Sequence, residues 1–249
     1  MDSTESTAAD ESAAADESAA AVESTAAVES AEQFWERHYR THRDWGTRVN
    51  PLLAETAAPL LPGTALDLGC GAGGDAVWLA RQGWHVTAVD ISATAVERLR
   101  ERARHLGVAD RVTAAQHDLA GGFPPGRFDL VSAQYFHTPF PLLRTHVLRA
   151  AARSLRPGGL LLIVDHGSTA PWSWNQDPAH HFPTSEEVAA DLGLDPARWP
   201  VLRAETARRR ATGPGGETAT VVDNVLLIQS TADLLRPTTG TERPDAEEH

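Results

Sequence analysis

The sequence predicts an α/β fold in which a mostly parallel sheet carries helices on both faces, and two observations predict it. Apolar strand-like runs alternate with amphipathic helical stretches across residues 64–192, and strands separated by helices imply right-handed crossovers within a parallel sheet. Two further strand-like runs flank the turn-forming residues 212–216, so a terminal hairpin is expected to bring one antiparallel strand into the sheet.

The elements follow from local patterns. The expected strands are apolar runs near residues 64–69, 84–90, 111–116, 127–133 and 159–165, with hairpin strands at 200–208 and 218–228. Helices are expected near residues 74–82, 92–106, 140–155 and 184–192, and the aromatic segment Phe34 to Arg40 also has a helical pattern. Pro157, Gly158 and Gly159 are expected to stop the helix at 140–155.

A glycine-rich corner follows the first expected strand. It reads Asp67-Leu68-Gly69-Cys70-Gly71-Ala72-Gly73-Gly74 and leads into a helix. Glycines there permit positive φ and let backbone N–H groups approach a ligand without Cβ atoms in the way. A nucleotide-like ligand is the first hypothesis.

The identity of that ligand depends on Asp67. Gly69, Gly71 and Gly74 also satisfy the G-x-G-x-x-G spacing of a dinucleotide-binding fold. A carboxylate two residues before the first glycine repels a pyrophosphate, but it suits a ligand with a cationic end. S-adenosylmethionine has such an end, in its ammonium and sulfonium groups.

Five motifs in register resemble class I S-adenosylmethionine-dependent methyltransferases, from about Phe34 to about Ser230. They are the acid and glycines of Asp67 to Gly73, the strand-end acid Asp90 followed by Ile91, the pair Asp118-Leu119, the strand Phe128 to Ser132, and the segment Leu155 to Ile163. The resemblance implies a Rossmann-like, seven-stranded, mostly parallel sheet that ends in an antiparallel hairpin. The chain also resembles small bacterial enzymes of the tellurite-resistance and thiopurine-methyltransferase-like kind, and this resemblance implies a thiol or chalcogen acceptor. Oxygen and nitrogen acceptors stay open.

The resemblance also implies roles for cofactor-binding residues. The turn with Gly69, Gly71 and Gly73 would lie against the methionine moiety, with Asp67 near its ammonium group. Asp90 would accept both ribose hydroxyls. The adenine and the rest of the cofactor would contact a further set: Ile91, Asp118, Leu119 and Gln134.

Each acid also has a plainer interpretation. Asp67 and Asp118 suit turns, and Asp90 precedes Ser92 at a helix N-terminus, where a carboxylate complements the dipole.

The acceptor end is expected after the strands at 127–133 and 159–165, because open α/β sheets bind ligands at the C-terminal ends of their strands. His137 is the candidate general base or substrate contact, since imidazole titrates near neutrality. Asp165 and His166 are placed to reach the same pocket. A lone histidine is more often structural, and many methyl transfers to soft nucleophiles need no base.

Aromatic side chains form two further groups. Trp35 and Trp45 lie near the N-terminus, and Trp172 and Trp174 lie in the loop after residue 165. They predict either an aromatic wall of an apolar acceptor pocket or ordinary core packing. No metal site is expected, because the adjacent pair His180-His181 lacks the spacing of metal ligands.

Composition excludes several functions. All 22 basic residues are arginine, so Schiff-base chemistry and a P-loop lysine are excluded. Cys70 is the single cysteine, which excludes an internal disulfide and a cysteine zinc cluster and fits a reducing compartment. No signal peptide or membrane-spanning run is evident. A cytoplasmic protein is expected.

The charge of −12 lies mainly at one end. Ten acids and no base lie in residues 1–36, which leaves 24 acids against 22 arginines in the body and no field for nucleic acid. Residues 1–31 repeat small and acidic residues and are expected to be disordered, as are residues 231–249, with a methyltransferase domain at 32–230.

The function predicted from these features is methyl transfer from S-adenosylmethionine to a small-molecule acceptor, without a nucleic-acid or membrane partner. Two alternatives stay open: an NAD(P)-dependent oxidoreductase, and a non-catalytic S-adenosylmethionine-binding domain that works through a protein partner.

Overall fold

The computed structural model describes residues 29–42, 46–173, 176–177, 179–213 and 216–231. The predicted tails, residues 1–31 and 231–249, lie almost entirely outside the described residues. The helices are α1 (Ala31–Thr41), α2 (Pro51–Ala57), α3 (Gly74–Arg81), α4 (Ala93–His105), α5 (Arg144–Arg153) and α6 (Ser185–Leu192), with a short 3₁₀ turn, η1 (Ala109–Arg111). The strands are β1 (Thr64–Leu68), β2 (His85–Asp90), β3 (Val112–Gln116), β4 (Phe128–Gln134), β5 (Leu155–His166), β6 (Val201–Thr212) and β7 (Thr218–Gln229).

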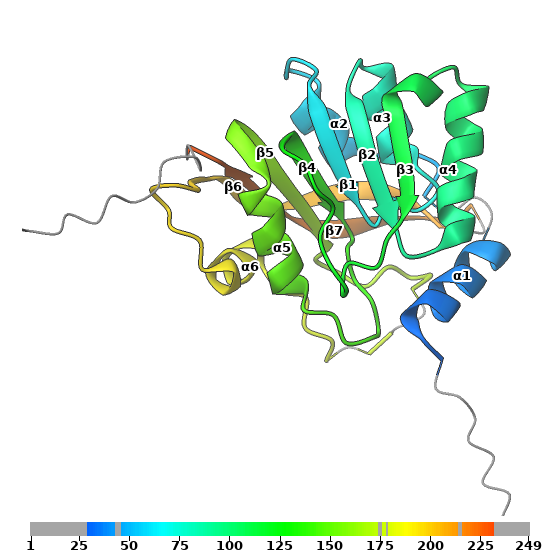
Figure 1. The fold of residues 1–249 in the computed structure, drawn as a ribbon. Helices are drawn as coiled ribbons and strands as arrows, with labels where there is room; N and C mark the ends of the chain where they lie inside the picture. Colours follow the sequence, from blue (N-terminus) through cyan, green and yellow to red (C-terminus); the bar gives the residue numbers. More distant parts are fainter. Residues whose placement is uncertain (1–28, 43–45, 174–175, 178, 214–215, 232–249) are drawn as a thin grey trace, which may run out of the picture.

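The described strands form one seven-stranded sheet in the order β3-β2-β1-β4-β5-β7-β6 (Figure 1). The pairings from β3 across to β5 are parallel, while β7 runs antiparallel to both β5 and β6. The order reverses between β1 and β4, and ligands of open α/β sheets bind at such a point. The predicted fold class, including the C-terminal hairpin, is confirmed.

Alternating side chains divide the core between the two faces of the sheet. Leu160 and Leu162 of β5 pack in the cluster that includes α2, α3 and α4, whereas Leu161 and Ile163 pack in the cluster that includes α5 and α6. Such alternation is required of a strand that is buried on both faces. Helix α1 contacts α4 and lies beyond the sheet, on the same side of the molecule as the C-terminal end of β3 (Figure 1).

The structure corrects the helix expected at residues 140–155. Helix α5 begins only at Arg144 and ends at Arg153, and Leu155 already pairs with Phe128 as the first residue of β5. Pro157, Gly158 and Gly159 therefore lie inside a strand, where the register between β4 and β5 shifts. Helix α2 was not predicted, although Asn50 and Pro51 form a good helix start, with the Asn50 side chain accepting from Leu52 N.

The glycine corner is packed tightly beneath α4. Gly73 has φ +81°, and a Cβ atom there would lie 2.2 Å from Cδ1 of Leu99. Both the backbone conformation and the space therefore require glycine at this position.

Gly73→Ala is expected to lower the free energy of unfolding by about 2–5 kcal/mol, since the positive φ costs about 1–2 kcal/mol and the overlap with Leu99 costs about 1–3 kcal/mol. The matched control is Gly158→Ala, because Gly158 has the same φ of +81° but no heavy atom within 4 Å of the added Cβ. The control is expected to cost only about 1–2 kcal/mol in urea unfolding. Equal losses would show that contact with Leu99 does not constrain the corner.

Candidate functional site

The glycine corner is joined to the end of β2 by backbone and side-chain hydrogen bonds. Gly69, Gly71 and Gly73 have φ values of +67°, +52° and +81°. Cys70 N donates to the Val89 carbonyl at 3.0 Å, and Gly71 N donates to Oδ2 of Asp90 at 2.9 Å. The corner therefore has a fixed shape before any ligand is considered.

Asp67 carries a buried carboxylate next to this corner. Its side chain is 2% exposed, and its Oδ2 atom has no hydrogen-bond partner among the described residues. Burial, together with the nearby Asp75 and Asp90, raises the pKa of Asp67 well above its ordinary value. A buried and unsatisfied carboxylate costs free energy, and a cationic group beside it would offset that cost.

Asp75 adds a second acid at the start of α3, and no sequence motif indicated its role. Its Oδ1 accepts from Asn50 N at 2.6 Å, and burial raises its pKa to about 6. Asn50 in turn donates through Nδ2 to Oε1 of Gln134 at 2.8 Å, and Gln134 Nε2 donates to Ser132 at 2.9 Å. Gln134 therefore lies beside the corner, but its side chain is engaged with protein groups.

Asp90, at the end of β2, is 6% exposed and has both oxygens occupied by backbone donors. Oδ2 accepts from Gly71 N and Oδ1 accepts from Ser92 N, both at 2.9 Å. Ser92 is the N-cap of α4. Asp90 therefore makes the contact with a helix start that its plainer interpretation predicts. Each carboxylate oxygen has a second lone pair, so these bonds do not exhaust its accepting capacity.

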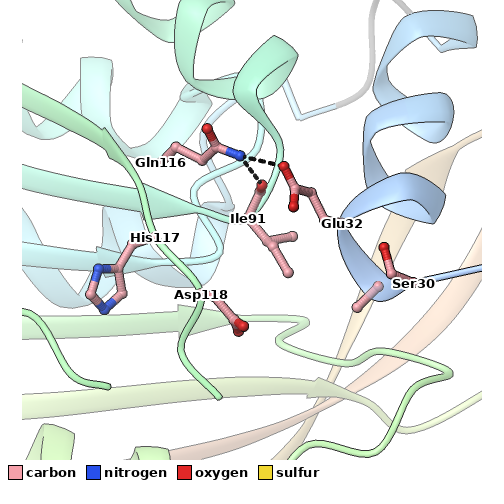
Figure 2. Close-up of a pocket in the computed structure, with 7 residues that line it drawn as sticks. Ser30, Glu32, Ile91, Gln116, His117 and Asp118 are labelled. Atoms are coloured by element: carbon pink, nitrogen blue, oxygen red, sulfur yellow. Dashed lines mark hydrogen bonds between the residues drawn. The ribbon is translucent and has the colours of Figure 1, made fainter. Parts of the chain in front are cut away.

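A cavity of about 360 Å³ adjoins the end of β2. Its lining combines Ile91 with the start of α1 and the end of β3: Ser30, Ala31, Glu32, Gln116, His117 and Asp118 (Figure 2). Gln116 Nε2 donates to Oε1 of Glu32 at 2.9 Å and to the Ile91 carbonyl at 3.1 Å, which joins α1 to the sheet across this cavity (Figure 2). This volume is at the lower end for ligand sites.

The predicted adenine contacts differ in how they meet the cavity. Ile91 and Asp118 line it, and Asp118 also accepts from Ala120 N at 2.8 Å in a local turn. Leu119 packs against the core cluster that includes α5 and α6. The bond from Ala120 N to Asp118 is the turn contact that the plainer interpretation of Asp118 predicts.

Helix α1 covers the glycine corner. Its buried Tyr39 places the hydroxyl 2.8 Å from where a Cβ of Gly71 would lie. Trp35 Nε1 donates to Oγ1 of Thr138 at 3.4 Å, and the rings of Phe34 and Phe140 meet edge to face. The predicted aromatic helix thus contacts both the corner and the loop after β4.

Glu36 fixes α1 to the start of α4. Its Oε2 accepts from Ser92 Oγ at 2.7 Å and from Thr94 N at 3.0 Å. Although burial opposes its ionisation, the hydrogen bonds from Thr94 and Ser92 and the nearby Arg40 lower the pKa of Glu36 to about 2. No sequence motif marked this acid, because Ser92 and Thr94, which bond it to α4, are more than 50 residues away.

The loop after β4 carries His137, the predicted catalytic residue. Its Nε2 lies 3.2 Å from Oδ1 of Asp165, which is buried at the end of β5, and the His137 side chain is 41% exposed. Nη2 of Arg144 donates to both oxygens of Asp165 at 2.7 Å. Although burial opposes ionisation of Asp165, the hydrogen bond from His137 and the charge of Arg144 hold its pKa below the ordinary value.

A second polar cluster joins Tyr135, which directly follows β4, to side chains of β5, β6 and β7. The Tyr135 and His166 rings stack 4.2 Å apart, and Tyr135 Oη donates to Oδ2 of Asp223 at 3.0 Å. Arg209 pairs with Asp223 and donates to Tyr135 Oη at 2.7 Å. Tyr135 is the non-glycine residue with positive φ (+50°) in the described part of the chain. Burial, with His137 and Arg209 nearby, lowers the pKa of His166.

The remaining aromatic predictions are only partly tested. Trp172 lies beside the β6–β7 turn, where a Cβ on Gly213 would come within 2.6 Å of its ring. Trp45 and Trp174 lie outside the described residues, so the aromatic wall of an acceptor pocket stays a prediction. His180 packs on Phe182, and His181 pairs with Glu187 at 3.1 Å.

Two further structural findings concern the described residues alone. No helix among them is both long and apolar enough to cross a membrane. No group of three or more metal-ligating side chains gathers among them.

Comparison with known sequences identifies similar proteins. The family described as a methyltransferase domain matches residues 65–159, from β1 to the first part of β5. The 27-O-demethylrifamycin SV methyltransferase of Amycolatopsis mediterranei is 38% identical over 137 residues, covering 53% of this chain and 49% of that protein. The ribosomal RNA small subunit methyltransferase C of Alcanivorax borkumensis is 35% identical over 136 residues, covering 51% and 39%. The chain thus spans less than half the length of these relatives.

Solved structures share the fold. One described for the conversion of a disulfide bond into a thioacetal group during echinomycin biosynthesis has a TM-score of 0.60 at 22% identity, covering 80% of this chain and 92% of that one. The magnesium protoporphyrin IX methyltransferase of Synechocystis, with bound S-adenosylmethionine, has a TM-score of 0.56 at 17% identity, covering 83% and 100%.

Glu36→Gln is expected to lower the free energy of unfolding by about 2 kcal/mol at pH 7. The reason is that the folded state stabilises the ionised Glu36 carboxylate more than the unfolded state does. The lowered pKa means that this contribution is full above the unfolded value of 4.5 and is lost as the pH falls toward about 2. Urea unfolding at several pH values measures it, with the exposed Glu97→Gln as control. If the difference in unfolding free energy between the wild type and Glu36→Gln does not shrink as the pH falls, the assigned role of Glu36 is contradicted.

Proposed function

We propose that this chain, which carries a class I S-adenosylmethionine-dependent methyltransferase domain, transfers the methyl group of that cofactor to a small-molecule acceptor. Because the chain spans only part of the length of its sequence relatives, the activity of the whole protein and its acceptor belong to this proposal.

The observation that carries the proposal is the unsatisfied carboxylate of Asp67. A buried oxygen without a hydrogen-bond partner, at the edge of a glycine corner, is the environment that an ammonium group would complete. Asp75 and Asp90 add negative potential there. A pyrophosphate would be repelled, so the charge supports S-adenosylmethionine over the NAD(P) alternative. By this test, the residues fit the cofactor.

The remaining cofactor assignments follow the order of the motifs. Gly69, Gly71 and Gly73 would lie against the methionine moiety, and the free lone pairs of Asp90 would accept from the ribose. Further contacts are assigned to the cavity and its surroundings: Ile91, Asp118, Leu119 and Gln134. When bound, the cofactor supplies a methyl group activated on a sulfonium, whose sulfur keeps the bonding electron pair.

The protein has two tasks in such a reaction, which are to orient the acceptor and to exclude water. Helix α1 would exclude water, since Tyr39 covers the corner and Glu32 closes one side of the cavity. His137 would contact the acceptor and take its proton as general base.

The choice of acceptor class rests on charge and on relatives. Residues 37–249 carry 24 acids against 22 arginines, so their net charge gives little attraction for a polyanion. A ubiquinone biosynthesis O-methyltransferase of Xanthomonas euvesicatoria is 36% identical over 121 residues, covering 46% of this chain and 49% of that protein. Together with the rifamycin relative, it favours a small hydroxylated acceptor. The lone Cys70 fits a reducing compartment, and a cytoplasmic location stays part of the proposal.

The direct test measures binding and transfer with the full chain. Calorimetry is expected to show binding of S-adenosylhomocysteine and no binding of NAD. Radiolabelled S-adenosylmethionine is then expected to label one of a panel of phenols, alcohols and thiols. Binding of the cofactor without labelling of any acceptor would favour the non-catalytic alternative, and absence of cofactor binding would overturn the proposal.

Asp67→Asn is expected to stabilise the cofactor-free protein by about 1–3 kcal/mol, because it removes a buried charge without changing shape. The raised pKa of Asp67 means that the wild type recovers stability relative to the variant as the pH falls from 7 toward 4. The same change is expected to weaken S-adenosylhomocysteine binding at least tenfold by calorimetry. A variant that is more stable and binds equally well would refute the ammonium assignment.

Asp90→Ala is expected to weaken S-adenosylhomocysteine binding by about 1.5–3 kcal/mol, the scale of hydrogen bonds to a charged group. Asp118→Ala is the comparison, since Asp118 is exposed and bonded to its own turn, and its loss is expected to be smaller. Thermal unfolding of both variants checks that the fold is retained. Unchanged affinity in folded Asp90→Ala would remove this residue from the ribose site.

A further inference from the structure

We infer that Asp165 and Arg144 are positioning residues, which hold His137 as the general base for an acceptor that presents a hydroxyl group. This inference rests on the proposed function and adds to it the residues that position the base and a chemical reason for a hydroxyl acceptor. It concerns the part of the site around the loop after β4, where Asp165 and Asp223 are paired with arginines.

The contact between His137 and Asp165 bears on which imidazole nitrogen carries the proton. Nε2 lies 3.2 Å from Oδ1 of a carboxylate that is 2% exposed. An ionised carboxylate only accepts hydrogen bonds, so this contact favours the proton on Nε2 and leaves the lone pair on Nδ1. Nδ1 of this half-exposed ring would then be the basic atom that acts on the acceptor.

Arg144 holds both partners in place. Its Nη2 donates to the two oxygens of Asp165, and its Nε donates to the carbonyl of Phe136 at 3.0 Å. Phe136 precedes His137, so one guanidinium orients the carboxylate and also fixes the backbone that carries the base. A flat guanidinium with several donors suits such a task, whereas a lysine would not.

Neighbouring residues of the same loop are each held by a different part of the fold. Tyr135 is bonded to Asp223 of β7, and Thr138 is bonded to Trp35 of α1. Phe136 also lies on the corner, since a Cβ at Gly69 would come within 3.1 Å of its ring. The loop with His137 is therefore held next to the proposed methyl-donor site.

The proton and methyl transfers balance with these residues alone and the cofactor of the proposed function. The acceptor O–H bond would break and its proton would pass to Nδ1 of His137. The acceptor oxygen would form a bond to the methyl carbon as the bond between that carbon and the sulfonium sulfur breaks, with its electron pair left on the sulfur. The resulting imidazolium is stabilised by the charge of Asp165 and returns its proton to water, to which His137 is 41% exposed.

The paired carboxylate favours a hydroxyl over a thiol. A thiol ionises near pH 8.5 and a phenol near 10, so a phenol at neutral pH depends far more on a base. A buried carboxylate that stabilises the imidazolium helps the base most with a hydroxyl group, because a hydroxyl gives up its proton less readily than a thiol. Asp223 with Arg209 provides a comparison, because it is an equally buried acid–arginine pair whose bond goes to Tyr135 and not to His137.

The test compares Asp165→Asn with Asp223→Asn in the full-length chain. In Asp165→Asn, the amide oxygen is expected to accept from Arg144, which turns the NH₂ group toward His137 and forces the proton onto Nδ1. ¹⁵N-histidine NMR of the cofactor-free protein, with His137→Gln to assign the signal, is expected to show Nε2–H in the wild type and in Asp223→Asn. The Nδ1–H form is expected in Asp165→Asn. A wild-type ring protonated on Nδ1 would overturn the inference.

Turnover supplies the second readout. Asp165→Asn is expected to lower kcat for a hydroxyl acceptor about 100-fold, within the usual range of general-base catalysis, with cofactor affinity changed less than twofold. His137→Ala is expected to cause a similar loss, and the double variant no greater one. Equal losses in Asp165→Asn and Asp223→Asn would assign Asp165 a structural role and overturn the inference, as would thiol turnover equally sensitive to Asp165→Asn. Because the NMR measurement needs no cofactor, a failure of the proposed function remains distinguishable from a failure of this inference.

Discussion

The carboxylate of Asp90 is the junction on which the arrangement of the site depends. Its two oxygens accept from Gly71 N in the glycine corner and from Ser92 N at the start of α4. The Ser92 hydroxyl then donates to Glu36 of α1. One buried acid at the end of β2 thus links the corner, α4 and the covering helix, although these segments are far apart in sequence. Charge-assisted bonds to backbone N–H groups are among the stronger hydrogen bonds in proteins, which suits this role.

The two ends of the proposed site differ in how their buried acids are balanced. At the glycine corner, Asp67 has an oxygen without a partner among the described residues, and its pKa is raised. At the other end, Asp165 is paired with Arg144 and Asp223 with Arg209. In the described part of the chain, an acid without a paired arginine at one end and arginine-paired acids at the other suit a cationic cofactor and a neutral acceptor. Helix α1 spans both ends through Tyr39 and Trp35.

Much of the fold was predictable from local patterns. The strands that end at Leu68 and Asp90, the helix from Ala93 and the terminal hairpin lie within a residue or a few of their expected bounds. The helix predicted from residue 140 begins only at Arg144. We attribute this late start to the Arg144 side chain, which bonds to Asp165 and to the Phe136 carbonyl. Those partners lie in a loop and a distant strand, so helical periodicity carries no sign of them.

The sequence by itself determined the order of strands and helices, the glycine corner and the acids at the strand ends, because these depend on the period of apolar residues and on backbone freedom. Only the tertiary structure decided which acids are neutralised. Asp67 and Asp165 both lie at or near the ends of buried strands, yet Arg144 is folded against only one of them. Glu36 and Tyr39 likewise gain their contacts only once α1 is packed on α4 and the corner. Pairing of charges depends on distances between segments remote in the chain, and those distances exist only in the folded protein.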